Sequence, residues 1–116
     1  MRTGTRQPTD SNYFNKEVAL NELLGAFQSD DATVTSVADS DSNQTILSAN
    51  SLRRGFIIYN DSTVTLYLKY GATATSTDFT IKLRPEGIHE SSGYKGRLDG
   101  IWESNASGSA RVTELL

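Results

Sequence analysis

The fold class is indicated most clearly by residues 55–70, which read GFIIYNDSTVTLYLKY. Residues 55–59 are continuously apolar, which is typical of a strand buried on both faces. Residues 60–63 are turn formers. In residues 64–70, apolar side chains alternate with Thr65, Tyr67 and Lys69, the pattern of a half-buried strand. So short a turn cannot provide the crossover connection that a parallel pair of strands would need.

The same period of two continues on both sides of residues 55–70. Further strands are predicted at residues 34–38, 45–48, 79–84, 88–90, 94–103 and 109–115. Within 94–103 the alternation slips, because Ile101 does not share the parity of Leu98 and Trp102, and a β-bulge or bend is expected at Gly100. Short turns separate the segments and leave no room for crossover helices. The sequence therefore predicts a mainly β protein, an antiparallel β-sandwich of jelly-roll or Greek-key type with about seven or eight strands.

The N-terminal part of the chain has a different pattern. Residues 1–12 are polar and predict an extended arm, and residues 15–27 carry apolar side chains at the i, i+3, i+4, i+7 spacing of an amphipathic helix. The stripe consists of Leu20, Leu23, Leu24 and Phe27. So short a helix needs a surface for its stripe, either on its own sandwich or on a neighbouring protein. We therefore divide the chain into an arm with one short helix (1–30) and a β-sandwich domain (31–116).

Composition and charge narrow the classes of function. The 116 residues have a formal net charge of −3 and no cysteine. An acidic balance is not the footprint of a nucleic-acid-binding domain, and the lack of cysteine excludes disulfides and thiolate metal sites. No apolar run is long enough to cross a membrane, and the first residues lack the apolar region of a signal peptide. We expect neither nucleic acid nor a membrane as a partner.

Residues suited to catalysis or metal binding are sparse. His89, the single histidine, stands beside Glu90, where a solvated polar pair is expected. The chain contains no nucleophile elbow, H-E-x-x-H pair or phosphate-binding glycine loop. Residues 39–43 (DSDSN) open like an EF-hand calcium loop, but Gln44 and Asn50 stand where that loop requires Gly and Glu. We expect no enzyme activity, no metal and no cofactor.

Aromatic and arginine residues leave alternatives open. The aromatic set of the strands is Tyr59, Tyr67, Tyr70, Tyr94 and Trp102. Its scatter over several strands favours core and cross-strand packing, and a platform for stacking sugars or bases is the alternative. Arg53 and Arg54 precede a strand, where they are either solvated or paired with the carboxylate of a partner protein.

Four segments carry a resemblance to a known type of protein. They are SLRRGFIIYNDS (51–62), LYLKYG (66–71), YKGRLDGIW (94–102) and ARVTEL (110–115). Together they resemble small virion proteins of tailed bacteriophages over roughly residues 50–116. The resemblance implies a β-sandwich module on the phage particle, either as a head-decorating (cement) protein or in a tail-associated role. It transfers no active-site residues.

The leading expectation is therefore a virion structural protein that is assembled in the host cytoplasm and stabilises the head shell. Its expected partners are other virion proteins, above all the major capsid protein, together with further copies of itself. A tail- or neck-associated structural protein and a receptor- or glycan-binding module are the alternatives. The arm would gain affinity by ordering on a neighbour. The residues expected to contact partners are Tyr13, Phe14, Leu20, Leu23, Leu24, Phe27, Arg53 and Arg54.

Overall fold

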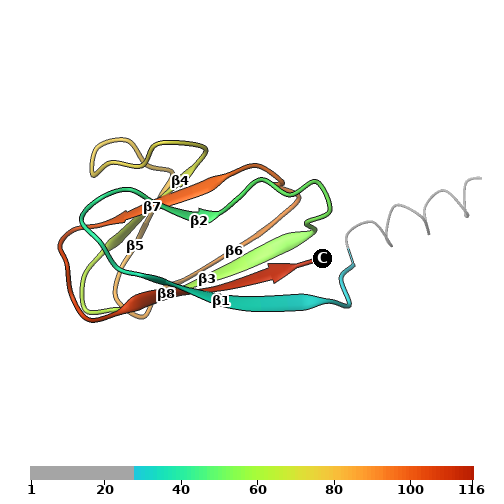
Figure 1. Cartoon of the computed structure of the whole chain (residues 1–116), viewed down its shortest axis with the longest axis horizontal. Coiled ribbons are helices and arrows are strands. Elements are labelled where there is room, and N and C mark those ends of the chain that lie inside the picture. The colour runs from blue at the N-terminus through green and yellow to red at the C-terminus, as the bar shows by residue number, and fades with distance from the viewer. Residues whose placement is uncertain (1–27) are drawn as a thin grey trace, which may run out of the picture.

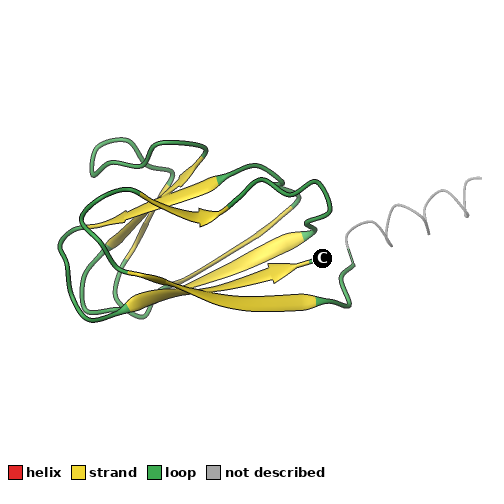
Figure 2. Ribbon diagram, in the orientation of Figure 1, coloured by secondary structure: helices red, strands yellow, loops and turns green. Residues whose placement is uncertain are grey.

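The computed structural model describes residues 28–116. Figure 2 shows that these residues form strands and loops and, within this range, no helix. The strands are β1 (Ala32–Ala38), β2 (Gln44–Leu47), β3 (Gly55–Asp61), β4 (Leu66–Tyr70), β5 (Ile81–Leu83), β6 (Ile88–Ser92), β7 (Leu98–Trp102) and β8 (Ser109–Leu115). The predicted mainly β class is confirmed.

The strands form two packed antiparallel sheets (Figure 1). The first sheet has the order β1-β8-β3-β6 and the second has the order β2-β7-β4-β5. The pairing is nested along the chain: β1 pairs with β8, β2 with β7, β3 with β6 and β4 with β5. Eight strands paired in this way on two sheets have the connectivity of a jelly roll.

The core lies between the sheets and is built from alternate side chains, as the period of two predicts. The fully buried apolar side chains include Phe56, Ile58 and Val112 from the first sheet and Leu66, Leu68, Leu98 and Trp102 from the second. Burial of each such aliphatic or Phe side chain stabilises the fold by about 1.5–3 kcal/mol. The core thus fixes which face of every strand remains outside.

Strand β3 is buried on one face only, which corrects the expectation of burial on both. Phe56, Ile58 and Asn60 point inward and are buried, whereas Ile57 and Tyr59 are only partly buried. The apolar run was continuous because both faces carry large side chains, yet no other described segment packs on the outer one.

The expected bulge at Gly100 is also corrected. The β4–β7 register runs without interruption through Gly100, and the register shift lies on β2, between Thr45 and Leu47. Gly100 points inward, and a Cβ there would lie 2.9 Å from Cγ1 of Ile46. Position 100 therefore requires glycine, because Ile46, the extra residue of β2, fills the space that a side chain would occupy.

Some strands are shorter than the alternation predicts. Strand β5 begins at Ile81, and Phe79 lies in the preceding loop with its ring 4.9 Å from that of Tyr67. Strand β7 begins at Leu98 because a turn precedes it, in which the hydroxyl of Tyr94 donates to the carbonyl of Arg97 at 2.6 Å. Local polar contacts end the ladders where periodicity alone would continue them.

Candidate interaction surface

The outward side chains of the first sheet form one continuous face. The strand register places them in two rows across β1, β8, β3 and β6: Val34, Thr113, Ile57 and Glu90 in one row, and Ser36, Arg111, Tyr59 and Ile88 in the next. We call these eight residues the outer face. Apolar and polar side chains are mixed across it, as is typical of non-obligate protein interfaces.

The outer face is open to solvent at its margins. Val34 on β1 and Ile88 on β6 are each 62% exposed, which is high for large apolar side chains. Arg111 lies 3.6 Å from the carboxylate of Asp61, and both side chains are about half exposed. No other segment of residues 28–116 crosses these rows.

The second sheet differs, because the loop 71–80 covers its outward side. Ala74 is buried, and its N–H donates to Oδ1 of Asn43 at 2.8 Å. The ring of Phe79 packs on Tyr67 in the same loop region. The two sheets therefore differ: among residues 28–116, the loop 71–80 covers the second sheet, and no segment covers the outer face of the first.

Beneath that cover a carboxylate is fully buried. Asp99 accepts hydrogen bonds from Nδ2 of Asn43 at 3.0 Å and from Nε of Arg97 at 2.6 Å. The bond to Asp99 raises the pKa of Arg97 above its usual value. The buried carboxylate is thus paired with a cation and an amide donor of the same chain, as a buried charge requires.

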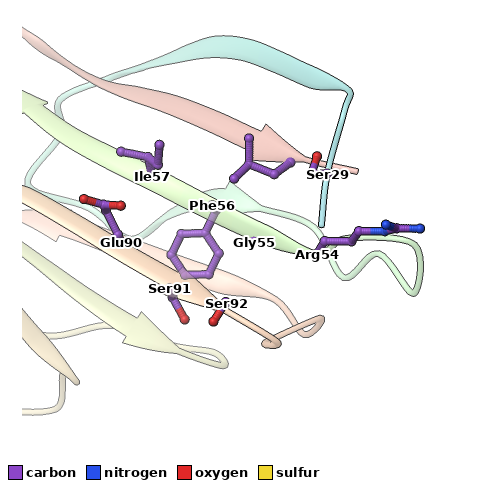
Figure 3. A pocket seen from close by; sticks show the side chains of 9 residues that line it. Ser29, Arg54, Gly55, Phe56, Ile57, Glu90, Ser91 and Ser92 are labelled. Carbon is purple, nitrogen blue, oxygen red and sulfur yellow. The ribbon is translucent and has the colours of Figure 1, made fainter. Parts of the chain in front are cut away.

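A shallow hollow opens at the end of the first sheet where β3 begins (Figure 3). It encloses about 270 Å³ and is lined by Ser29, Arg54, Gly55, Phe56, Ile57, Glu90, Ser91, Ser92 and Leu115. Figure 3 shows Ile57 and Glu90 on the opposite side of the sheet from the Phe56 ring. The hollow is smaller and more polar than a typical small-molecule pocket.

The N-terminal segment joins the sandwich beside this hollow. Ser29 donates its hydroxyl to the carbonyl of Leu116 at 2.7 Å, and the N–H of Leu116 donates to the carbonyl of Asp31 at 2.8 Å. The guanidinium of Arg54 donates to the carbonyl of Gln28. Gln28 and Ser29 are therefore fixed to the end of the first sheet.

The residues expected to contact partners divide into three groups. Those of the N-terminal part, Tyr13, Phe14, Leu20, Leu23, Leu24 and Phe27, lie outside the described residues. Arg54 lines the hollow and is partly buried. Arg53 lies elsewhere, in the interior.

Arg53 is in neither of the two environments expected for it, because its side chain is completely buried. Its Nε donates to Oε2 of Glu114 at 2.8 Å, so its carboxylate partner belongs to this chain. Nη1 donates to the carbonyls of Tyr94 (3.3 Å) and Gly96 (2.8 Å), and Nη2 to that of Ser48. The side chain ties the ends of β2 and β8 to the loop before β7, which is a structural role.

The aromatic side chains mostly serve packing, as was favoured. Trp102 is buried and donates from Nε1 to Oδ1 of Asn60 at 3.3 Å. Tyr70 and Tyr94 stack with ring centroids 4.6 Å apart. A stacking platform for sugars would need these rings exposed.

His89 points between the sheets and is not the solvated partner of Glu90. Its Nε2 lies 2.7 Å from the hydroxyl of Tyr70, and its ring centroid lies 6.0 Å from that of Phe56. Burial lowers the pKa of His89 below its usual 6.5. The surroundings therefore favour the neutral form of the imidazole.

The calcium-like turn 39–43 is an anchor between loops. The carboxylate of Asp39 accepts hydrogen bonds from the N–H groups of Ala106 (3.1 Å) and Gly108 (3.0 Å). Within residues 28–116 no three His, Cys, Asp or Glu side chains cluster as metal ligands would. The carboxylate therefore acts as a hydrogen-bond acceptor for backbone.

Sequence reasoning missed most of the outer face. Val34 and Ile88 stand alone in short polar-rich strands, and Ile57 and Tyr59 were assigned to a doubly buried strand. A signal was present in the parity of residues 55–59, since alternate residues of a sandwich strand must face outward. Parity does not reveal whether another segment covers that side.

No protein-family model matches this chain, and a search of curated proteins finds no match. Among residues 28–116 we find no helix that is long and apolar enough to span a membrane.

Proposed function

We propose that this protein is a structural component of a bacteriophage virion, a decoration or cement protein that binds the head shell and stabilises it. The observation that supports this most is the open outer face, with its exposed apolar side chains Val34 and Ile88 on the two edge strands of the first sheet. Apolar side chains grouped on one face of a rigid sheet are typical of a surface that contacts another protein.

The polar groups of the interior support a non-catalytic role. The buried polar side chains Arg53, Asn60 and Asp99 are each satisfied by partners of the same chain. His89 is held by Tyr70. Catalysis requires polar groups that converge on a substrate, whereas these groups bond to side chains and backbone within the fold.

The jelly roll by itself does not choose among functions, since viral capsid proteins, lectins and cupins share this architecture. The resemblance of residues 51–62, 66–71, 94–102 and 110–115 to small phage virion proteins is what points to a particle. The burial of Trp102 and the stacking of Tyr70 on Tyr94 speak against the glycan-binding alternative.

The experiment adds the purified protein back to phage particles that lack it. We expect saturable binding and a higher temperature of genome release. The variant Ile88→Asp, at the rim of the outer face, should bind at least about tenfold more weakly. Leu52→Asp is the matched control, because Leu52 is 73% exposed and lies outside the outer face. Equal binding by Ile88→Asp and the wild type would remove the outer face from the proposal.

A second variant tests the N-terminal part. Deletion of residues 1–27 keeps Gln28 and Ser29 with their contacts to Arg54 and Leu116. We expect the shortened protein to unfold at the same temperature as the full chain but to lose particle binding. If the shortened protein binds as tightly as the full chain, the arm has no part in attachment.

Counting the copies per particle separates the remaining locations. On the order of hundreds of copies is expected for a protein of the head shell, and about a dozen or fewer would place it in the neck or tail. A protein that is absent from purified particles would contradict the whole proposal.

A further inference from the structure

Strand β1 is an edge strand without the usual protection. The four edge strands of the sandwich are β1 and β6 in the first sheet and β2 and β5 in the second. Natural proteins protect sheet edges with charges, irregularities, proline or very short strands. Strand β1 is seven residues long, reads ATVTSVA, and contains neither a charged residue nor proline.

The other three edges each carry a protective feature. Strand β5 has only three residues and includes Lys82. Strand β2 has four residues and an irregular register. Strand β6 carries Glu90 on its exposed side. Strand β1 is therefore the one edge within residues 28–116 that is built to accept another strand.

The hydrogen bonds at its two ends show which backbone groups face outward. The carbonyl of Asp31 accepts from Leu116, and the N–H of Asp39 donates to Gly108. Because backbone direction alternates along an antiparallel strand, the odd-numbered residues of β1 bond to β8. The even-numbered residues point their N–H and C=O groups away from the sheet; they are Ala32, Val34, Ser36 and Ala38.

We propose that β1 pairs with β1 of a second copy of this chain, antiparallel and about a two-fold axis at Thr35. In this register Ala32 lies opposite Ala38 of the second copy, and Val34 lies opposite Ser36. The four outward residues of each strand then exchange eight backbone hydrogen bonds, two for each opposed pair. No outward group of either strand remains unpaired.

Charge permits pairing along β1 and limits it to this strand. The seven residues contain no like charges to oppose each other, as a self-pairing strand requires. The first charged residues on either side are Asp31 and Asp39, which lie opposite each other in this register, so their repulsion ends the pairing there. The carboxylate of Asp39 is already directed to the N–H groups of Ala106 and Gly108. Pairing thus extends over β1 and stops at the aspartates.

The dimer would join two first sheets into one eight-stranded sheet. Since the two-fold axis stands perpendicular to the sheet, both outer faces lie on the same side and form one continuous surface. This inference is independent of the proposed virion role, because it concerns only how two copies of the chain meet.

The oligomeric state of the full-length protein tests the inference. Light scattering coupled to size exclusion should give twice the 12.7 kDa mass of one chain. Thr35→Lys places two ammonium groups face to face on the axis and should raise the dissociation constant at least about a hundredfold. Thr35→Glu should do the same, and mixing the two variants should restore a dimer. Thr45→Lys, a matched change of an exposed threonine on edge strand β2, should leave the dimer intact.

Cross-linking locates the axis. The chain has no native cysteine, so Thr35→Cys should form an intermolecular disulfide under mild oxidation. Thr33→Cys, on the same strand and face, lies opposite Val37 of the second copy and should cross-link poorly. A wild type that stays monomeric at about 1 mM, a dimer that Thr35→Lys leaves unchanged, or equal cross-linking at both positions would overturn the proposal. So would a Thr35→Lys and Thr35→Glu mixture that stays monomeric.

Discussion

The hydroxyl of Tyr70 lies 2.7 Å from Nε2 of His89 and connects the two sheets of the jelly roll. Tyr70 ends β4 in the second sheet, and His89 lies near the start of β6 in the first. Around them, the Tyr70 ring packs edge-on to Phe56 with centroids 5.9 Å apart. The chain's single histidine is thus part of the packing between sheets.

This position makes the stability of the protein depend on pH. Burial lowers the pKa of His89 below 6.5 in the folded state, so the unfolded chain takes up the proton first as pH falls. The stabilisation is complete above the unfolded pKa and is lost as pH falls through the folded one. We expect the melting temperature to drop more steeply below about pH 6.5 in the wild type than in His89→Asn. Parallel melting curves for the two proteins between neutral and acidic pH would contradict this.

Arg53 and Glu114 provide a second prediction. The completely buried guanidinium holds Glu114 and the carbonyls of Ser48, Tyr94 and Gly96. Lysine cannot reproduce this fork of donors, and breaking a buried ion pair costs about 3–5 kcal/mol. Arg53→Lys should therefore lower the free energy of unfolding by roughly 3 kcal/mol, measured in urea by the fluorescence of the buried Trp102.

The control for this change is Arg111→Lys. Arg111 lies 3.6 Å from Asp61, and both side chains are about half exposed. Such surface pairs contribute at most about 1 kcal/mol. If the free energy of unfolding falls equally in the two variants, the burial of Arg53 does not explain its contribution to stability.

The sequence predicts the strands of this structure better than it predicts the candidate interaction surface. The sequence pattern located every strand, by period-two alternation in most of them and by a continuous apolar run in β3, because the direction of a strand side chain is decided locally. Arg53 could not be predicted, since its four acceptors come from residues 48, 94, 96 and 114. The openness of the outer face at Ile57 and Tyr59 was missed for a related reason: whether a face is covered depends on how distant segments such as the loop 71–80 are placed.

Asn60 provides a third prediction, because its side chain forms hydrogen bonds with four other residues. Its Nδ2 donates to the carbonyls of Val64 (2.9 Å) and Leu83 (3.0 Å), and its Oδ1 accepts from Ser62 and Trp102. Asn60→Asp keeps the shape but turns a carboxylate toward two carbonyls. We expect a loss of at least about 3 kcal/mol in the free energy of unfolding at neutral pH, because the second oxygen of the buried carboxylate faces two carbonyls and has no donor.

Two comparisons sharpen the test of Asn60. The loss should shrink in acid, where protonation restores one donor to the introduced carboxyl group. Asn105→Asp is the control, because Asn105 is exposed and only accepts a bond from the N–H of Asp41, which a carboxylate also does. If both variants unfold at the same urea concentration as the wild type, the four-way role of Asn60 is wrong.

The contact between Gly100 and Ile46 provides the last prediction. A Cβ on Gly100 would lie 2.9 Å from Cγ1 of Ile46 and 3.1 Å from Cδ1 of Leu66, inside a closed core. Overpacking of this kind costs about 1–3 kcal/mol, so Gly100→Ala should be destabilised by that amount. Ile46→Ala is destabilised for the opposite reason, since it leaves a cavity. In the double variant the new methyl group enters the space that the Ile46 side chain vacates. The loss of stability in the double variant should therefore be smaller than the sum of the two single losses by more than about 0.5 kcal/mol. Strict additivity in urea unfolding would mean that the β2 irregularity at Ile46 does not determine the need for glycine at position 100.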